Sequence, residues 1–153
     1  MNVVIAADHA GFKYKSDLIE VIKSMGHNVA DIGTDSTRSV DYPEIAEKAS
    51  GFVACGQADI GILLCGSGIG MDIVANKIKG IRSAVCCSAE TAGVARSHNS
   101  ANVLCLGVRF LSLEKCVEIT KIFISTPVSS EERHIRRVNK ITEIEERNFT
   151  CND

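Results

Sequence analysis

Strand-like runs that alternate with segments of helical spacing constrain the fold of this chain more than any other feature. The runs are residues 2–7, 27–32, 60–64, 83–87 and 103–106. The first of them, Asn-Val-Val-Ile-Ala-Ala, is almost continuously apolar, which is typical of a strand buried on both faces of a parallel sheet. The alternation predicts an α/β fold with helices on both faces of a parallel sheet. We expect the first and third strands to be neighbours.

Helix-boundary signals stand between these runs. Residues 12–25 have one apolar face with lysines opposite, and Gly26 is a plausible C-cap. Ser88 and Ser112 are N-cap candidates for the helices that follow them. Residues 129–132, Ser-Ser-Glu-Glu, have the pattern of a capping box that opens a long last helix.

The length and composition predict one domain over residues 1–153, large enough to bury a sizeable core. A net charge of −2 gives no electrostatic reason to expect nucleic acid as the main partner. No apolar run approaches the roughly 20 residues that span a bilayer, and the N-terminus lacks the basic segment of a signal peptide. We therefore expect neither a membrane partner nor secretion.

The seven cysteines are scattered, and none forms a C-x-x-C pair or has a histidine at zinc-ligand spacing. Most of them fall inside apolar runs, so we expect buried, reduced thiols, no metal site and a cytoplasmic protein. They stand at positions 55, 65, 86, 87, 105, 116 and 151. Cys65 is an exception because of its surroundings.

Cys65 opens a glycine loop, Cys-Gly-Ser-Gly-Ile-Gly at 65–70, that joins the third strand to a helix over about 69–77. Met71 stands where a dinucleotide fingerprint needs glycine or alanine, and no Gly-Lys-Ser/Thr follows, so the loop is neither that fingerprint nor a P-loop. Such a loop can point several N–H groups at one anion; a tight turn without a ligand is the alternative. A thiol beside these groups is suited to act as a nucleophile or a general base, and a core cysteine at a strand end is the alternative.

Further polar residues lie next to the first and fifth strands. Asp8 and His9 close the first strand, His98 and Asn99 precede the fifth, and Arg109 follows it. Because open α/β sheets bind ligands at the carboxyl ends of their strands, we expect these residues to gather near one edge. A carboxylate and an imidazole there suit proton transfer. The structural alternatives are an N-cap for Asp8 and contacts with helix carbonyls for His98.

The last helix carries Arg133, Arg137 and Lys140 on one face, and two guanidiniums on one face match a phosphate monoester. A solvated basic face paired with Glu131 and Glu132 is the alternative. Phosphate-binding arginines, an anion-binding loop and proton carriers together suit proton transfer on a small phosphorylated substrate. An aldose–ketose isomerisation through an enediolate has these requirements.

Short motifs spread over nearly the whole chain carry a family resemblance. They are Ala7-Asp-His-Ala-Gly11, Asp41-Tyr-Pro43, Cys65-Gly-Ser-Gly-Ile-Gly70, Ala75-Asn-Lys77, His98-Asn-x-Ala-Asn102, Leu106-Gly-x-Arg109 and Arg133-His-x-Arg-Arg137. In order and spacing they resemble the ribose-5-phosphate isomerase B family, which includes galactose-6-phosphate isomerase subunits.

The resemblance implies a fold, a reaction and an assembly. The fold is a three-layer αβα sandwich with five parallel strands, which is Rossmann-like. The reaction is the interconversion of ribose 5-phosphate and ribulose 5-phosphate through an enediolate, without a cofactor. The assembly is a homodimer or a dimer of dimers with active sites between subunits, in which the last helix, at about 129–147, packs on the partner.

The resemblance also implies catalytic roles. Cys65 is the base that moves the proton between C1 and C2, Asp8 handles protons on the sugar oxygens, and His98 of the partner subunit helps to open the furanose ring. The enediolate is held by the hydroxyl of Ser67 and by the N–H groups of Gly66, Gly68, Ile69 and Gly70.

Binding roles are implied in the same way. Asn99 binds sugar oxygens, and Tyr42 approaches the sugar. The phosphate is held by His9, Arg109, Arg133 and Arg137.

Cys65 together with Met71 matches the lineage of the family that uses a cysteine base rather than a glutamate just after the glycine loop. Ser67 stands where many cysteine-type members carry threonine, and it retains the hydroxyl. Two alternatives stay open: the same chemistry on a hexose 6-phosphate, such as allose or galactose 6-phosphate, and a non-catalytic module that binds sugar phosphates.

Overall fold

The computed structural model describes residues 1–150 and contains a five-stranded sheet in which every strand pair is parallel. Cys151 lies outside the described residues. The sheet order is β2-β1-β3-β5-β4, so the first and third strands are neighbours, as predicted. The strands are β1 (Asn2–Ala7), β2 (Asn28–Asp31), β3 (Ile60–Cys65), β4 (Ser83–Val85) and β5 (Val103–Gly107).

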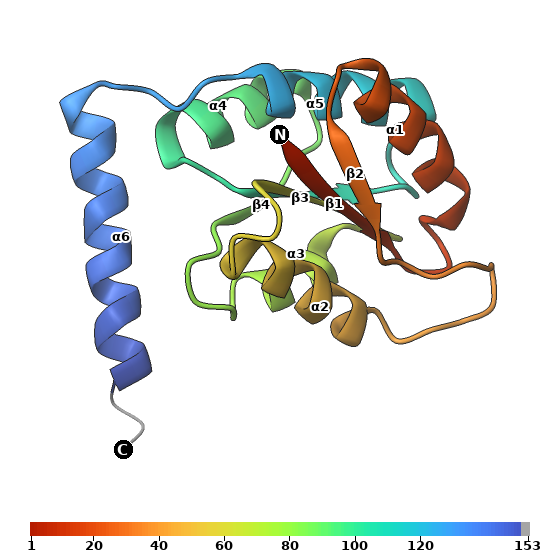
Figure 1. Ribbon diagram of the computed structural model, residues 1–153, viewed down its shortest axis with the longest axis horizontal. Helices are drawn as coiled ribbons and strands as arrows, with labels where there is room; N and C mark the ends of the chain where they lie inside the picture. The colour runs from red at the N-terminus through yellow and green to blue at the C-terminus, as the bar shows by residue number, and fades with distance from the viewer. Residues whose placement is uncertain (151–153) are drawn as a thin grey trace.

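Helices cover both faces of this sheet and complete a three-layer αβα sandwich (Figure 1). In that view α1, α4 and α5 lie above the sheet, and α2 and α3 lie below it. The predicted fold class is therefore confirmed. The helices are α1 (Phe12–Ser24), α2 (Tyr42–Ala54), α3 (Ile69–Ala75), α4 (Ala89–Asn99), α5 (Leu113–Ser125) and α6 (Glu132–Thr150).

The hydrophobic core is divided into two clusters by the sheet. In β3, Ile62 and Leu64 belong to the cluster that includes Leu18 of α1, whereas Leu63 and Cys65 belong to the one that includes Met71 of α3. Successive strand residues point to opposite faces, so a strand covered on both sides is apolar at every position. This explains the continuous apolar runs and places the Cys65 side chain on the face covered by α2 and α3.

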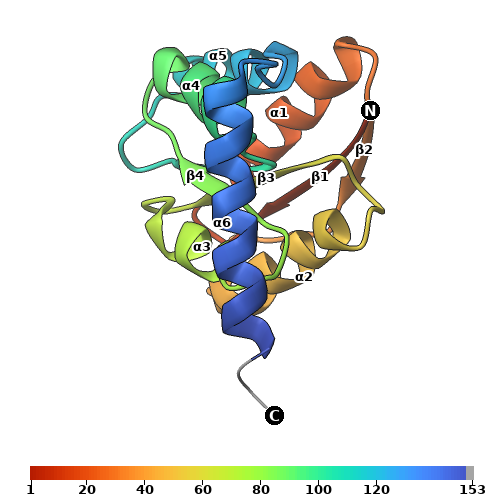
Figure 2. The same cartoon turned by 90° about the vertical axis from the view of Figure 1, so that its left-hand side faces the viewer.

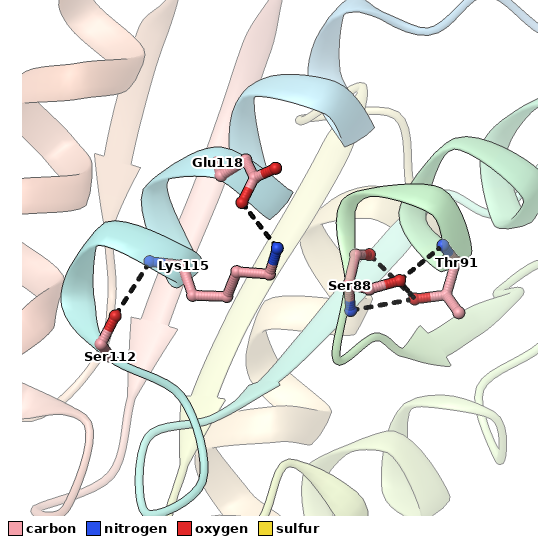
Figure 3. A network of polar contacts seen from close by, with 5 residues as sticks. All are labelled: Ser88, Thr91, Ser112, Lys115 and Glu118. Atoms are coloured by element: carbon pink, nitrogen blue, oxygen red, sulfur yellow. Dashed lines mark hydrogen bonds and ion pairs between the residues drawn. The ribbon is translucent and has the colours of Figure 1, made fainter.

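The predicted N-caps of α4 and α5 are confirmed (Figure 3). The Ser88 hydroxyl accepts a hydrogen bond from the Thr91 N–H at 3.2 Å, and the Ser112 hydroxyl accepts one from the Lys115 N–H at 3.3 Å. Lys115 Nζ also pairs with Glu118 at 2.7 Å. The caps fix where these helices begin after β4 and β5.

Two predicted boundaries are wrong. The fourth strand ends at Val85 rather than at residue 87, because the chain turns there toward the Ser88 cap, and Cys87 is exposed as a result. The last helix begins at Glu132, since the Ser129 hydroxyl accepts a hydrogen bond from the N–H of Glu131 at 3.1 Å instead of capping a helix from residue 130. The capping box is therefore not formed.

Helix α6 stands beside the sheet, on the left of Figure 1, and crosses in front of the β4 edge in Figure 2. Its apolar side chains Ile135, Ile141 and Ile144 are 43–49% exposed. A cavity of about 450 Å³ separates its second half from the body, and Arg82 lies on the opposite wall. Within this one chain the apolar stripe of α6 is thus only partly covered. No helix within residues 1–150 is both long and apolar enough to cross a membrane.

Candidate active site

The carboxyl ends of three neighbouring strands bring several predicted site residues together. Asp8 follows β1, Cys65 ends β3, and Arg109 follows β5. Backbone hydrogen bonds join these segments: the Asp8 N–H donates to the Leu64 carbonyl at 3.0 Å, and the Arg109 N–H donates to the Gly66 carbonyl at 3.0 Å. The expectation of a polar edge at the carboxyl ends is confirmed for these residues.

The Cys65 thiol is 4% exposed and lies under the glycine loop. Its Sγ accepts a hydrogen bond from the Gly68 N–H at 3.1 Å. A donor at this distance stabilises negative charge on the sulfur. Next to it, the Ile69 N–H donates to the Ser67 hydroxyl at 3.3 Å. The loop therefore holds a thiol, a hydroxyl and several N–H groups within a few residues.

The glycines of this loop have close neighbours. Gly68 has a φ of 79°, a left-handed conformation that glycine adopts without cost. A Cβ on Gly66 would lie 2.9 Å from Arg109 Nε, and one on Gly70 would lie 2.6 Å from the Tyr42 ring. The guanidinium of Arg109 and the phenol of Tyr42 therefore pack directly on the loop. For Tyr42, this position is the one that contact with a ligand at the loop would require.

Gly107 supports the loop from below. A Cβ on Gly107 would lie 2.6 Å from the carbonyl carbon of Ser67 and closer still to its oxygen. Residue 107 pairs with Cys65 in the sheet, so β5 contacts the glycine loop directly beside the thiol. Sequence reasoning did not select Gly107, although it lies within the Leu106-Gly-x-Arg109 motif.

Asp8 and His9 have partners within the chain. One Asp8 carboxylate oxygen accepts hydrogen bonds from the N–H groups of Ala10 at 2.9 Å and Gly11 at 3.1 Å, so Asp8 also shapes the start of α1. His9 Nδ1 accepts a hydrogen bond from the Val40 N–H at 3.3 Å. This bond assigns the proton of the neutral imidazole to Nε2 and ties the loop before α2 to the site.

Lys15 anchors the loop before α2, and this role of Lys15 was not predicted from the sequence. Its Nζ donates to Asp31 at 2.8 Å and to the Thr34 carbonyl at 2.6 Å, and the residue is only 5% exposed. The lysines of α1 were all expected on the solvent face. Lys15 precedes Leu18 and Ile22 by three and seven residues, so helical spacing places it on the buried face.

The remaining predicted site residues lie elsewhere in the chain. A helix that follows a parallel strand runs back antiparallel to it, so the C-terminal residues His98 and Asn99 of α4 return to the amino-end edge of the sheet. Arg133 and Arg137 are exposed on α6, at the left of Figure 1, while β1 runs toward the right. The expectation that all these residues gather at one edge is wrong for a single chain.

The site residues thus form two sets. The thiol set lies at the carboxyl ends of the strands and consists of Asp8, His9, Tyr42, Cys65, Gly66, Ser67, Gly68, Ile69, Gly70 and Arg109. The histidine set lies at the end of α4 and on α6 and consists of His98, Asn99, Arg133 and Arg137. In the histidine set, Arg133 pairs with Glu131 at 2.7 Å. The alternative interpretation of the basic face, in which it pairs with neighbouring acidic residues, is therefore met for Arg133 in the single chain.

The other described cysteines have structural surroundings. Burial raises the pKa of Cys86 and of Cys116 to about 11 and raises that of Cys105 well above its ordinary value. These thiols are protonated at neutral pH, in agreement with the prediction of buried core thiols. Cys55 and Cys87 are exposed, contrary to that prediction. The six described cysteines are all free thiols.

Among residues 1–150, no cluster of three or more histidine, cysteine, aspartate or glutamate side chains is arranged to hold a metal ion. The chemistry available in the thiol set is instead acid–base: a thiol, a carboxylate and an imidazole around a row of N–H donors.

Comparisons with known proteins show similarity over almost the whole chain. The family model described as Ribose/Galactose Isomerase matches residues 3–141. The chain is 40% identical over 150 residues to a putative sugar phosphate isomerase of Bacillus subtilis, which covers 97% of this chain and 100% of that one. It is 39% identical over 146 residues to ribose-5-phosphate isomerase B of Escherichia coli, which covers 95% and 97% of the two chains.

Solved structures agree with this similarity. A type B ribose 5-phosphate isomerase of Trypanosoma brucei superposes with a TM-score of 0.91 at 45% identity, covering 94% of this chain and 97% of that one. A ribose-5-phosphate isomerase B of Mycoplasma genitalium with bound ribulose-5-phosphate superposes with a TM-score of 0.90 at 37% identity, covering 95% and 96%.

Proposed function

The chain belongs to the ribose/galactose isomerase family, and from that membership we propose that it interconverts ribose 5-phosphate and ribulose 5-phosphate. The observation that carries the proposal is the Cys65 thiol, which lies at the carboxyl end of a central strand with the Gly68 N–H on its sulfur. A base next to a row of N–H donors is what proton abstraction beside a carbonyl requires.

In the proposed mechanism the Cys65 thiolate removes the C2 proton of the open-chain aldose. The electron pair of that C–H bond forms the C1–C2 double bond of an enediolate, and negative charge develops on O1. The N–H groups of the glycine loop and the Ser67 hydroxyl stabilise this charge; one such donor is typically worth about 3 kcal/mol. Asp8 exchanges protons on O1 and O2, and the Cys65 thiol returns its proton to C1 to form the ketose.

The phosphate and the sugar ring are handled by both sets. His9 and Arg109 lie in the thiol set and contact the phosphate from there. Arg133 and Arg137 of the partner subunit hold the same phosphate, and His98 of the partner subunit opens the furanose ring. A homodimer with shared sites accounts for the separation of the two sets within one chain.

The uncovered surface of α6 supports this assembly. Its exposed isoleucines and the cavity beside it leave an apolar stripe that a second copy would bury. The free state of the six described cysteines supports a reducing compartment, the cytoplasm.

The pentose is favoured over a hexose 6-phosphate. The relatives from Escherichia coli and Mycobacterium leprae are named ribose-5-phosphate isomerase B, and the Mycoplasma genitalium structure holds ribulose-5-phosphate. Comparing kcat/KM for ribose 5-phosphate and allose 6-phosphate tests this preference directly.

A coupled isomerase assay with Cys65→Ala tests the assignment of the base. Without the thiolate we expect kcat to fall by about 10³-fold or more, since general-base catalysis contributes on this scale. Ribose 5-phosphate binding, measured by calorimetry, should persist. Cys55→Ala is the matched control, because Cys55 is an exposed thiol outside both sets. The wild-type assay is run with and without EDTA, and we expect no difference. Near-normal turnover by Cys65→Ala would refute the base.

Mixing two variants, each defective at ribose 5-phosphate concentrations well below the wild-type KM, tests the shared site. In a Cys65→Ala/Arg137→Ala heterodimer, one site carries both substitutions and the other carries neither. Equal amounts of the two variants, unfolded together and refolded, should recover about a quarter of wild-type activity, because half of the dimers are mixed and each has one intact site. If the mixture stays inactive although both variants refold, the two sets do not belong to a common site.

A further inference from the structure

His134 lies in the Arg133-His-x-Arg-Arg137 motif but belongs to neither the thiol set nor the histidine set. Its ring stacks on the ring of His98 with centroids 4.1 Å apart and planes inclined by 13°. His98 is on the last turn of α4, and His134 is on the first turn of α6. The two rings therefore meet across a junction between helices that are more than thirty residues apart in the sequence.

The two imidazoles have unequal surroundings. His98 is exposed, whereas His134 is only 5% exposed. The Nε2 atom of His134 has no hydrogen-bond partner within the described residues. An imidazole usually orients itself through hydrogen bonds from both nitrogens. Here the ring is oriented by packing, and its flat face is turned to His98.

Charge on the pair also favours a neutral His134. Burial lowers the pKa of His134, the neighbouring His98 and Arg133 lower it further, and Arg137 adds to this effect, while Glu131 opposes it. A neutral aromatic face can stack on His98 in either of its protonation states, and it attracts the protonated form. A proton can therefore enter and leave His98 without loss of the stack.

Polar contacts also lie at the junction between the end of α4 and the start of α6, where the two rings stack. The Ser129 N–H donates to the Ser97 carbonyl at 3.0 Å and joins the segment before α6 to the end of α4. Glu131 Oε2 lies 2.7 Å from Arg133 Nε and 3.8 Å from His134 Nε2. One carboxylate thus lies beside both a proposed phosphate ligand and the ring that stacks on His98.

We propose that His134 is a positioning residue for ring opening: its buried ring, stacked on His98, holds the His98 imidazole in the orientation in which a ring nitrogen reaches the furanose oxygen in the partner's site. This rests on the proposed function, in which His98 opens the sugar ring. His134 itself touches no substrate atom. Its contribution is the loss of rotational freedom of an otherwise exposed side chain, since misplacing a catalytic group by about 1 Å can cost 10²-fold.

Ring opening can be measured apart from isomerisation. Ribose 5-phosphate anomers interconvert through the open-chain aldehyde, and magnetisation exchange at a ¹³C-labelled C1 reports that rate by NMR. In a Cys65→Ala background the sugar is not consumed, so catalysed exchange isolates the His98 step. Into this background we introduce His98→Ala, His134→Ala, His134→Phe and, as a control, Asn139→Ala, which changes an exposed residue of the same helix.

The expected pattern follows from stacking. His98→Ala should abolish catalysed exchange, and His134→Ala should slow it by about 10- to 100-fold. His134→Phe keeps a flat, neutral ring and should restore exchange to within about threefold of the parent, and Asn139→Ala should match the parent. If His134 had only a structural role, the His134→Phe substitution would not restore the rate of ring opening. Thermal unfolding of each variant checks that the fold is retained.

Two results would overturn the proposal. One is exchange by His134→Ala at the parent rate. The other is exchange by His134→Phe as slow as by His134→Ala, in a variant that unfolds at the parent temperature. Failure of the proposed function is recognised separately, because the chain with Cys65 intact would then not convert ribose 5-phosphate to ribulose 5-phosphate at all.

Discussion

Replacing Gly107 by alanine should slow catalysis without replacing any residue of the proposed site. The added Cβ would lie 2.6 Å from the carbonyl carbon of Ser67. Since carbon atoms pack at about 3.5 Å or more, Ser67 must retreat by about 1 Å. That movement shifts the loop donors relative to the Cys65 sulfur, and a displacement of this size can cost about 10²-fold in rate.

The assay separates kcat from KM. In the proposed site the phosphate is held by arginines outside the loop, so we expect kcat to fall by about 100-fold while KM changes by less than about threefold. Overpacking should cost about 1–3 kcal/mol of the free energy of unfolding.

Gly51→Ala is the matched control for this experiment. A Cβ at Gly51, within α2, meets no atom within 4 Å. This variant should keep full activity and gain about 0.5–1 kcal/mol, because alanine is the better helix former. A folded Gly107→Ala enzyme with wild-type kcat would refute the claim that β5 positions the loop.

Three other outcomes follow from the structure. Lys15→Met removes the donor to the Thr34 carbonyl and should lower the free energy of unfolding by about 1–3 kcal/mol in urea titrations, with a raised KM because the loop before α2 loosens. Burial holds the Cys86 pKa at about 11 in the folded chain, against 9.0 for an ordinary thiol, so the unfolded state releases its proton first. The stability from this group is complete below about pH 9 and is lost as the pH rises toward 11, so the urea midpoint should fall over that range, and less steeply in Cys86→Ala. Arg137→Ala should raise KM for ribose 5-phosphate far more than it affects a non-phosphorylated pentose; an equal effect on both would leave that arginine without a role in phosphate binding.

Local patterns in the sequence were enough to predict the sheet and most of the thiol set, namely Asp8, His9, the glycine loop at 65–70 and Arg109, whereas Tyr42 came only from the family resemblance. The strand that ends in Cys65 is apolar throughout because helices cover both of its faces, and the glycine loop follows it immediately. The caps at Ser88 and Ser112 were also readable, because the hydrogen bond of an N-cap spans only three residues. Asp8 and Arg109 lie at the same edge as Cys65 because the strands that they follow flank β3.

Features that depend on distant contacts were not readable from the residues alone. His98 precedes a strand, and only the reversal of direction in α4 shows that it lies at the opposite edge. Helical spacing places Lys15 on the buried face of α1, but no local pattern identifies Asp31 and Thr34 as its partners. The stack of His98 on His134 joins two helices whose relative placement no local pattern specifies.

Apart from the Ser67 hydroxyl, the donors proposed for the glycine loop are main-chain N–H groups, and this limits how the enzyme can be altered by mutation. No codon change removes or replaces an amide hydrogen without introducing proline. Engineering of the reaction rate must therefore act on the supports of the loop: Gly107 beneath it, Val85 beside it and Tyr42 above it. A library of substitutions at these three positions would vary the geometry of the proposed anion site, whereas substitutions within the loop would mainly disrupt it.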